Sequence, residues 1–298
     1  MPAVVDRFAD RVPPLAALGL AVLAVSTSAI LIRFSAAPSL VKAFYRVLFT
    51  VGLLAPIAFL RHRSAIGGLT RRQILTAGAT GIALAIHFAA WFESLEWTSV
   101  AASVTLVQSQ PLFVALGAFL VLDERLNRPI ALGIAVAVAG ILMMTVPGAT
   151  LTGARPVYGN ALAILGAVMM AGYVLAGRSL RQRIAVVPYV TVVYTVCAAM
   201  LLLFALGDGA TVWLGAYPPQ EWGLFLAMAV GPGLLGHTVL NWALKHVESS
   251  VVSVTLLGEP VGSTLLAVVL LREIPGLWTV AGGAVVLAGI YLTVRGRN

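Results

Sequence analysis

Long apolar stretches recur from one end of this 298-residue chain to the other. A bilayer core about 30 Å thick requires about 20 mostly apolar residues for each helix that crosses it. Only 10% of the residues are charged, whereas a soluble domain carries about 25%. The sequence therefore predicts an integral membrane protein in which residues 1–298 form a single transmembrane domain.

The apolar stretches are predicted to be helices rather than strands. A membrane barrel requires short segments that alternate in polarity, and runs such as IALGIAVAVAGILMM at 130–144 do not alternate. We therefore expect an all-α protein with ten transmembrane helices. They are expected at residues 14–32, 39–60, 73–92, 99–121, 130–146, 157–177, 187–206, 222–241, 249–271 and 277–294.

The distribution of positive charge indicates the orientation. Cytoplasmic loops are enriched in Lys and Arg, and fourteen of the nineteen Lys and Arg residues fall on one side of the ten helices against three on the other. Both chain ends are therefore expected in the cytoplasm. The net charge of +8 does not indicate nucleic-acid binding, because that function requires a basic patch on a folded soluble face. The fourteen are Arg7, Arg11, Arg61, Arg63, Arg71, Arg72, Arg125, Arg128, Arg178, Arg181, Arg183, Lys245, Arg295 and Arg297, and the three are Arg33, Arg155 and Arg272.

The first apolar run is expected to stay in the membrane as the first helix. It is followed by SAA at 35–37, which resembles a signal-peptide cleavage site. The run is longer, however, than the apolar region of about 7–15 residues that signal peptides contain. The single cysteine, Cys197, lies in the seventh span, where it excludes an intrachain disulfide and is expected to serve packing.

The second half of the chain repeats the first. Matching positions are separated by 150 residues before a shared proline and by 149 after it, and they include SVTL at 103–106 and 253–256, His87 and His237, Pro111 and Pro260, and Glu124 and Glu273. Repeat one covers about 12–148 and repeat two about 155–295, with five predicted spans in each. Because five is odd, the second repeat must insert upside down relative to the first. Inverted repeats are typical of secondary transporters; the alternative is duplication of a purely structural bundle.

These features resemble a known family. PSLVKAFYR at 38–46, proline within the fourth and ninth spans, and a Glu after each of those spans are similar to the EamA-type members of the drug/metabolite transporter superfamily. Within that superfamily the chain is most similar to the bacterial YddG-type amino-acid exporters. The resemblance implies ten helices around a central cavity, export of amino acids, aromatic ones in particular, and a place in the bacterial cytoplasmic (inner) membrane.

Glu259 is the acidic residue that a membrane span should tolerate least, since an ionisable residue at the bilayer centre costs about 2.5–3.5 kcal/mol on insertion scales. Pro260 follows it and removes a helical N–H, which is expected to leave the carbonyl near Leu256 without a partner. Such groups are tolerated only where protein or a water-filled cavity satisfies them. We therefore expect Glu259 to face a cavity, with Gly258 allowing close approach and with kinks at Pro260 and, in the first half, at Pro111.

The first half carries Gln108, Ser109 and Gln110 where the second carries the acid. A site for an asymmetric molecule requires such a difference in charge, although drift after duplication predicts the same pattern. Gln108 is a candidate substrate-binding residue on the first of these interpretations. On the second, the polar residues serve as hydrogen-bond partners between helices.

A second charged group lies in the second span. Lys42 and Arg46 are four residues apart and so project from one helical face, with Tyr45 beside them. The planar guanidinium of Arg46 suits a carboxylate, either that of a substrate or that of Glu259. The alternative is a fixed structural ion pair.

Aromatic and imidazole side chains supply further candidates. His87 and Trp91 are stacked along one face of the third span, His237 and Asn241 along one face of the eighth, and Tyr173 lies in the sixth. The imidazoles can relay protons, or they can simply pack with hydrogen bonds. Trp91 can contact an aromatic or cationic group, or it can lie at the membrane interface.

The pattern as a whole predicts a secondary transporter working by alternating access, most simply an exporter of neutral or aromatic amino acids. Alternative cargoes are cationic drugs or other metabolites; a membrane scaffold and an intramembrane enzyme are the competing classes. No HExxH or Walker A motif occurs, so no metal, cofactor or ATP use is expected. The expected partners are a small-molecule substrate and the lipid bilayer, with no nucleic acid, and the protein is expected to act as a monomer.

Overall fold

The computed structural model describes residues 13–98, 103, 106–124, 127–145, 155–272 and 276–296, and every regular element in these ranges is helical. The longer helices are α2 (Pro14–Phe34), α3 (Ser39–Arg61), α5 (Arg71–Trp97), α7 (Gln110–Val121), α8 (Arg128–Thr145), α9 (Pro156–Arg181), α10 (Val186–Gly207), α11 (Pro219–Met228) and α15 (Leu277–Arg295). The shorter ones are α4 (Arg63–Gly67), η2 (Leu214–Ala216), η3 (Ala229–Thr238), α12 (Val239–Ala243), α13 (Ser249–Thr255), α14 (Gly258–Leu266) and η4 (Ala267–Leu271).

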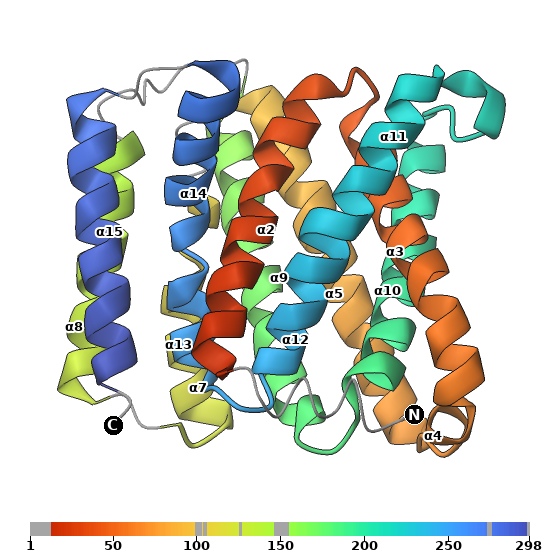
Figure 1. Cartoon of the computed structure of the whole chain (residues 1–298), viewed down its shortest axis with the longest axis horizontal. Coiled ribbons are helices and arrows are strands. Elements are labelled where there is room, and N and C mark those ends of the chain that lie inside the picture. Colours follow the sequence, from red (N-terminus) through yellow and green to blue (C-terminus); the bar gives the residue numbers. More distant parts are fainter. Residues whose placement is uncertain are drawn as a thin grey trace.

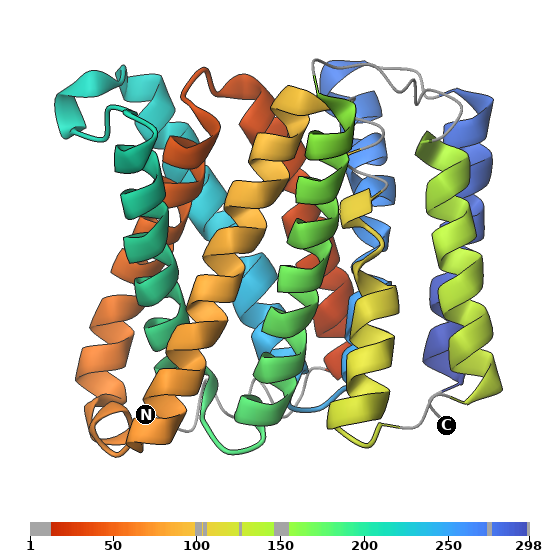
Figure 2. The ribbon, with the colours of Figure 1, turned by 180° about the vertical axis from the view of Figure 1, so that it is seen from behind.

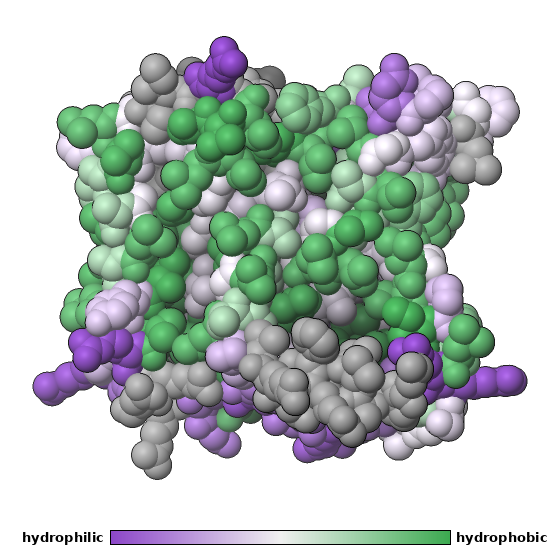
Figure 3. All heavy atoms as spheres, in the orientation of Figure 1, coloured by the Kyte–Doolittle hydropathy of each residue, from purple (hydrophilic) through white to green (hydrophobic). Residues whose placement is uncertain are grey.

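Eight helical segments in the described ranges are long and apolar enough to cross a bilayer, and α7 and α8 contribute two shorter apolar segments, Gln110–Val121 and Arg128–Met143. Hydrophobic side chains cover the middle of the face shown in Figure 3, with hydrophilic residues at its upper and lower edges. The prediction of an all-α membrane protein is confirmed. The two shorter segments fall in the fourth and fifth predicted spans, which run partly over residues outside the described ranges, so the number ten stays a prediction.

Helices of the first half pack mainly on helices of the second. α5 lies along α9, α3 along α10, α2 along η3, and α8 along α15. The α8–α15 pair lies at the left side of the molecule in Figure 1 and at the right side in Figure 2. This pair is close because glycines line it: a Cβ on Gly289 would lie 2.7 Å from the Cα of Ala137. Small residues allow such approach between membrane helices.

Successive long helices alternate in direction. In Figure 1, α2 begins and α15 ends on the same side of the molecule, and α9, the first long helix of the second half, runs opposite to α2. The loop between α2 and α3 and the start of α11 lie at the upper end, whereas the ends of α7, α9 and α12 lie at the lower end.

The two proline-containing spans are interrupted at matching points. α13 ends at Thr255 and α14 begins at Gly258, immediately before Glu259 and Pro260; in the first half α7 begins at Gln110, immediately before Pro111. The prediction of an unpaired carbonyl near Leu256 is wrong, because the Glu259 amide donates to the Leu256 carbonyl at 2.9 Å. The chain satisfies this carbonyl with a tighter turn.

The eighth span is also irregular. α11 and α12 are joined by η3, a π-helical segment that contains Pro232. Proline lacks the N–H that an α-helix requires and crowds the preceding turn. The Thr50 hydroxyl of α3 lies against this segment, donating to the Ala229 carbonyl (3.2 Å) and to its own helix at the Arg46 carbonyl (2.7 Å). The irregular segment carries His237 at its end, and π-helical segments are frequent at functional sites.

Candidate functional site

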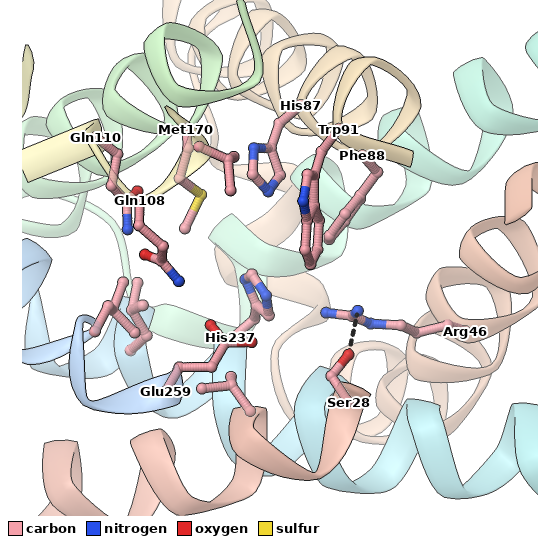
Figure 4. A pocket seen from close by; sticks show the side chains of 14 residues that line it. Ser28, Arg46, His87, Phe88, Trp91, Gln108, Gln110, Met170, His237 and Glu259 are labelled. Carbon is pink, nitrogen blue, oxygen red and sulfur yellow. Dashed lines mark hydrogen bonds between the residues drawn. The ribbon is translucent and has the colours of Figure 1, made fainter. Parts of the chain in front are cut away.

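A cavity of about 50 Å³ lies between the two halves. Figure 4 shows that the side chains around it come from helices far apart in the sequence. A single water molecule requires about 10–15 Å³, so the cavity has room for a few waters, and an organic solute requires the helices to move apart. The lining residues are Val25, Ser28, Arg46, His87, Phe88, Trp91, Val107, Gln108, Gln110, Met170, His237, Leu240, Leu256 and Glu259.

Arg46 provides the positive charge of the cavity. It is only 4% exposed, and its Nη1 donates to the Ser28 hydroxyl of α2 at 3.3 Å. Its Cζ lies 4.7 Å from the centre of the Phe88 ring, in a cation–π contact that partly replaces lost hydration. The guanidinium keeps further donors that can bind a planar carboxylate.

Glu259 provides the negative charge, from the other side of the cavity (Figure 4). The Ser26 hydroxyl donates to the backbone carbonyl of Glu259 at 3.2 Å and so anchors this part of α14 to α2. Within the described part of the chain, neither Arg46 nor Glu259 takes part in an ion pair. The fixed structural pair that the sequence left open as an alternative is therefore absent between these two residues.

The walls between the charges are aromatic and partly polar. His87 Nδ1 lies 2.9 Å from the Gly166 carbonyl, which in the neutral ring places the proton on Nδ1 and leaves Nε2 as an acceptor. The rings of His87 and Trp91 are stacked with centroids 6.0 Å apart, and His237 meets Phe88 edge to face at 5.9 Å.

Three cavity residues carry buried polar atoms that have no hydrogen-bond partner among the described residues: Trp91 Nε1, Gln110 Oε1 and His237 Nδ1. A buried polar group left unpaired costs about 1–3 kcal/mol. A cavity that holds water or a polar solute removes this cost. These three atoms are therefore candidate hydrogen-bonding groups for a ligand. Three residues that do not line the cavity also carry buried atoms that are unpaired in the described part of the chain, namely Tyr189, Asn241 and Ser250.

Six of the ten predicted binding residues line this cavity, namely Arg46, His87, Trp91, Gln108, His237 and Glu259. Lys42 and Tyr45 do not. Lys42 Nζ donates to the Ile32 carbonyl at the end of α2, and the Tyr45 hydroxyl donates to the Val212 carbonyl at 2.5 Å. Both lie about one helical turn or less from Arg46, but their bonds lie at the end of the bundle where α2 ends and α11 begins.

Tyr173 and Asn241 are also outside the cavity. Asn241 Nδ2 donates to the Tyr173 hydroxyl (2.5 Å), to the Tyr194 hydroxyl (3.4 Å) and to the His237 carbonyl (2.7 Å). Both residues are fully buried. Asn241 therefore ties α9, α10 and α12 together and holds the backbone of His237, rather than contacting the cavity.

Sequence reasoning did not select Phe88 as a binding candidate, and it gave Gln110 no binding role although it lies in the same polar stretch as Gln108. A signal existed for Gln110, which precedes Pro111 as Glu259 precedes Pro260, at the offset of 149 residues that the repeat shows after the proline. Phe88 carried no such signal, because the sequence does not distinguish an apolar residue that lines a cavity from an apolar residue that faces lipid.

Polar clusters join the two halves at both ends of the molecule. At the lower end, the Glu124 carboxylate accepts from Arg178 Nε at 3.0 Å, from the Ser249 amide at 3.1 Å and from the Ser249 hydroxyl at 2.8 Å. At the upper end, the Glu221 carboxylate accepts from the Ser35 hydroxyl at 2.5 Å and from the Ala36 amide at 2.8 Å. Glu273, the repeat partner of Glu124, lies outside the described residues.

Solved structures with the same fold exist. A protein whose crystal structure is known superimposes with a TM-score of 0.78, covering 94% of this chain and 96% of that one at 23% sequence identity. This identity is too low to carry function, but the superposition over nearly the whole of both chains shows a shared fold.

Relatives among curated proteins are transporters. The pseudopaline exporter CntI of Pseudomonas aeruginosa is 28% identical over 255 residues, which cover 85% of this chain and 86% of the relative. An uncharacterized transporter of Archaeoglobus fulgidus is 25% identical over 258 residues, or 86% and 88% of the two chains. The EamA-like transporter family matches twice, at residues 13–146 and 157–295. These two matches include nearly all of the described residues, and the chain belongs to the EamA-like transporter family of multi-pass membrane proteins.

Proposed function

We propose that this membrane transporter is a secondary transporter of small zwitterionic solutes, which exports neutral and aromatic amino acids across the bacterial cytoplasmic membrane. The observation that carries the proposal is a buried cavity that holds one guanidinium and one carboxylate on opposite sides without an ion pair between them. Unpaired charges in a membrane interior are costly. A zwitterion placed between Arg46 and Glu259 compensates both at once.

The roles of the lining residues follow from their chemistry. Arg46 receives the substrate carboxylate, and Glu259 with Gln108 receives the ammonium group. The indole of Trp91 and the ring of Phe88 enclose the substrate side chain. The cavity of about 50 Å³ is smaller than an amino acid, so the described state is one from which the helices open.

Alternating access follows from a proposed pair of inverted five-helix repeats, ten spans in all. Three observations support the repeats: the opposite directions of α2 and α9, the two family matches, and contacts that recur with the halves exchanged. Thus α5 packs on α9 as η3 packs on α2, and α7 packs on α9 as α14 packs on α2. Rocking of such repeats around a fixed central site exchanges access between the two sides.

The clusters around Glu124 and Glu221 are the gates in this proposal, one at each end of the cavity. Arginines at the ends of α3, α9 and α15 and at the starts of α5 and α8 gather at the Glu124 end. By the enrichment of positive charge in cytoplasmic loops, this end faces the cytoplasm, together with both chain ends. Opening of the Glu124 cluster then admits cytoplasmic substrate.

A second cargo is another metabolite or an organic cation, for which Glu259 is the counter-charge and Arg46 is structural. The Pseudomonas aeruginosa relative is named as a pseudopaline exporter, which supports export as the direction of transport. The two cargoes make different demands on the ligand: an amino acid requires both its carboxylate and its amine, whereas an organic cation requires no carboxylate.

Counterflow in liposomes containing the purified protein tests the proposal. Labelled phenylalanine or leucine is expected to accumulate, and unlabelled analogues without the carboxylate or without the amine are expected not to compete. Glu259→Gln is expected to lower this flux at least tenfold with the protein still folded. Glu93→Gln, in an exposed Glu whose carboxylate accepts from Trp97 Nε1 at 2.7 Å, is the matched control and is expected to transport normally. Equal competition by decarboxylated amines would assign the site to cations instead.

A further inference from the structure

We propose that Gln110 determines the charge class of the cargo, by keeping neutral the position that carries Glu259 in the other half of the chain. This inference rests on the proposed function, because it concerns selection at the same cavity. It assigns to one residue the choice between zwitterionic and cationic solutes.

Gln110 and Glu259 occupy equivalent positions in the two halves of the chain. Gln110 begins α7 directly before Pro111, whereas Glu259 lies at the start of α14 directly before Pro260, so the two side chains enter the cavity from equivalent helix starts. Figure 4 shows Gln110, Gln108 and Glu259 on the side of the cavity away from Arg46. A change of charge at residue 110 therefore acts on the same part of a bound solute as Glu259.

The side-chain amide of Gln110 is buried and incompletely hydrogen-bonded. The residue is 6% exposed, and its Oε1 is buried without a hydrogen-bond partner in the described part of the chain. Buried polar side chains are nearly always paired; Asn241 Oδ1 is likewise unpaired among the described residues, and what distinguishes Gln110 is that its side chain lines the cavity. Gln110 lines the cavity, so a small rotation of its amide brings this acceptor toward a solute donor such as an ammonium group.

The formal charges of the cavity-lining residues determine which solute charge the cavity favours. Among the lining residues only Arg46 and Glu259 carry a formal charge when the imidazoles are neutral, so the cavity sums to zero. A net-neutral solute preserves that sum, whereas a solute of charge +1 leaves an uncompensated charge inside the membrane, which is strongly unfavourable. A carboxylate at position 110 reverses this preference. Glutamine and glutamate have nearly the same shape, so the exchange alters charge with little change in packing.

The test compares Gln110→Glu with two matched variants, Gln110→Met and Gln108→Glu, in liposomes at alkaline pH. The measured quantity is the flux of lysine divided by the flux of leucine. Gln110→Glu is expected to raise this ratio at least tenfold, and to raise it further as the pH increases, because only an ionised carboxylate attracts the cation. Gln110→Met is expected to lower both fluxes and leave the ratio within twofold of wild type.

Three results would overturn the inference. They are an unchanged ratio in folded Gln110→Glu protein, an equal rise in Gln110→Met, and an equal rise in Gln108→Glu, which would assign selection to the cavity charge in general. Gln108→Glu adds the same charge at a half-buried side chain, whereas Gln110 is only 6% exposed. Because water screens a partly exposed charge more than a buried one, Gln108→Glu is expected to raise the ratio less.

Failure of the proposed function is distinguishable from failure of this inference. If wild-type protein exchanged no amino acid, the proposed function would fail. Gln110 would still be tested by thermal stabilisation of the purified variants with hexylamine, a cation of charge +1, against hexanol, a neutral alcohol of similar length. Preferential stabilisation of Gln110→Glu by hexylamine would support the inference, and equal stabilisation of wild type would refute it.

Discussion

Replacing Glu124 with Gln is expected to open the cavity toward the cytoplasm. The Glu124 side chain is only 9% exposed and joins α7 to Arg178 at the end of α9 and to Ser249 at the start of α13. All three donors belong to the second half of the chain. The proposed cytoplasmic gate therefore depends on one carboxylate.

The expected loss of stability of the closed state can be calculated from these hydrogen bonds. A hydrogen bond to a charged group contributes about 1.5–3 kcal/mol, and a neutral one about 0.5–1.5 kcal/mol. Glutamine keeps the volume and an acceptor for Ser249 but loses the charge opposite Arg178. Arg178 keeps its bond from Nη1 to the Leu244 carbonyl. The net loss in the closed state is about 1.4 kcal/mol, which corresponds to about a tenfold larger fraction of cytoplasm-open protein.

Labelling of a cysteine placed in the cavity measures that fraction. The native Cys197 is fully buried and provides an unreactive background, and Gln108→Cys supplies a lining thiol. A membrane-impermeant maleimide added from the cytoplasmic side is expected to react about ten times faster when Glu124→Gln is also present. Glu93→Gln, the same substitution at an exposed site, is expected to have no effect. An unchanged rate, or an increase seen only from the opposite side, would refute the gate.

Three further variants probe separate parts of the structure. Arg46→Lys keeps the charge but not the planar fork, and is expected to lower zwitterion flux in liposomes at least tenfold. Gly289→Val places a side chain against the Ala137 backbone of α8 and is expected to destabilise the protein by about 1–3 kcal/mol, seen as a lower unfolding temperature in detergent. Gly19→Val, where a Cβ would meet nothing within 4 Å, is the control. Asn241→Ala removes the donor to three acceptors and is expected to lower the unfolding temperature, by a loss of about 1–3 kcal/mol, while leaving cargo preference unchanged; a changed preference would return Asn241 to the binding surface.

The fold class was predictable from the sequence because lipid offers the backbone no hydrogen bonds. Each span must satisfy its own N–H and C=O groups, so long apolar runs become helices whatever their neighbours are. The repeat was predictable too, because it is visible as matching residues in the amino-acid sequence itself. Glu259 and Arg46 stood out as cavity candidates for a similar reason: a charge inside a span requires a polar surrounding wherever it lies.

Which polar residues meet was decided only by the tertiary structure. Helical spacing places Trp91 beside His87 on one face, but it does not say which way that face points. Tyr173 and Asn241 carry polar atoms as suitable as those of Gln110, yet they are closed into a bond with each other, while Gln110 faces the cavity. The difference arises from the packing of α7, α9 and α12, helices that are far apart in the sequence. Periodicity along one helix carries no information about the rotation of another, and that rotation decides what a membrane-buried side chain touches.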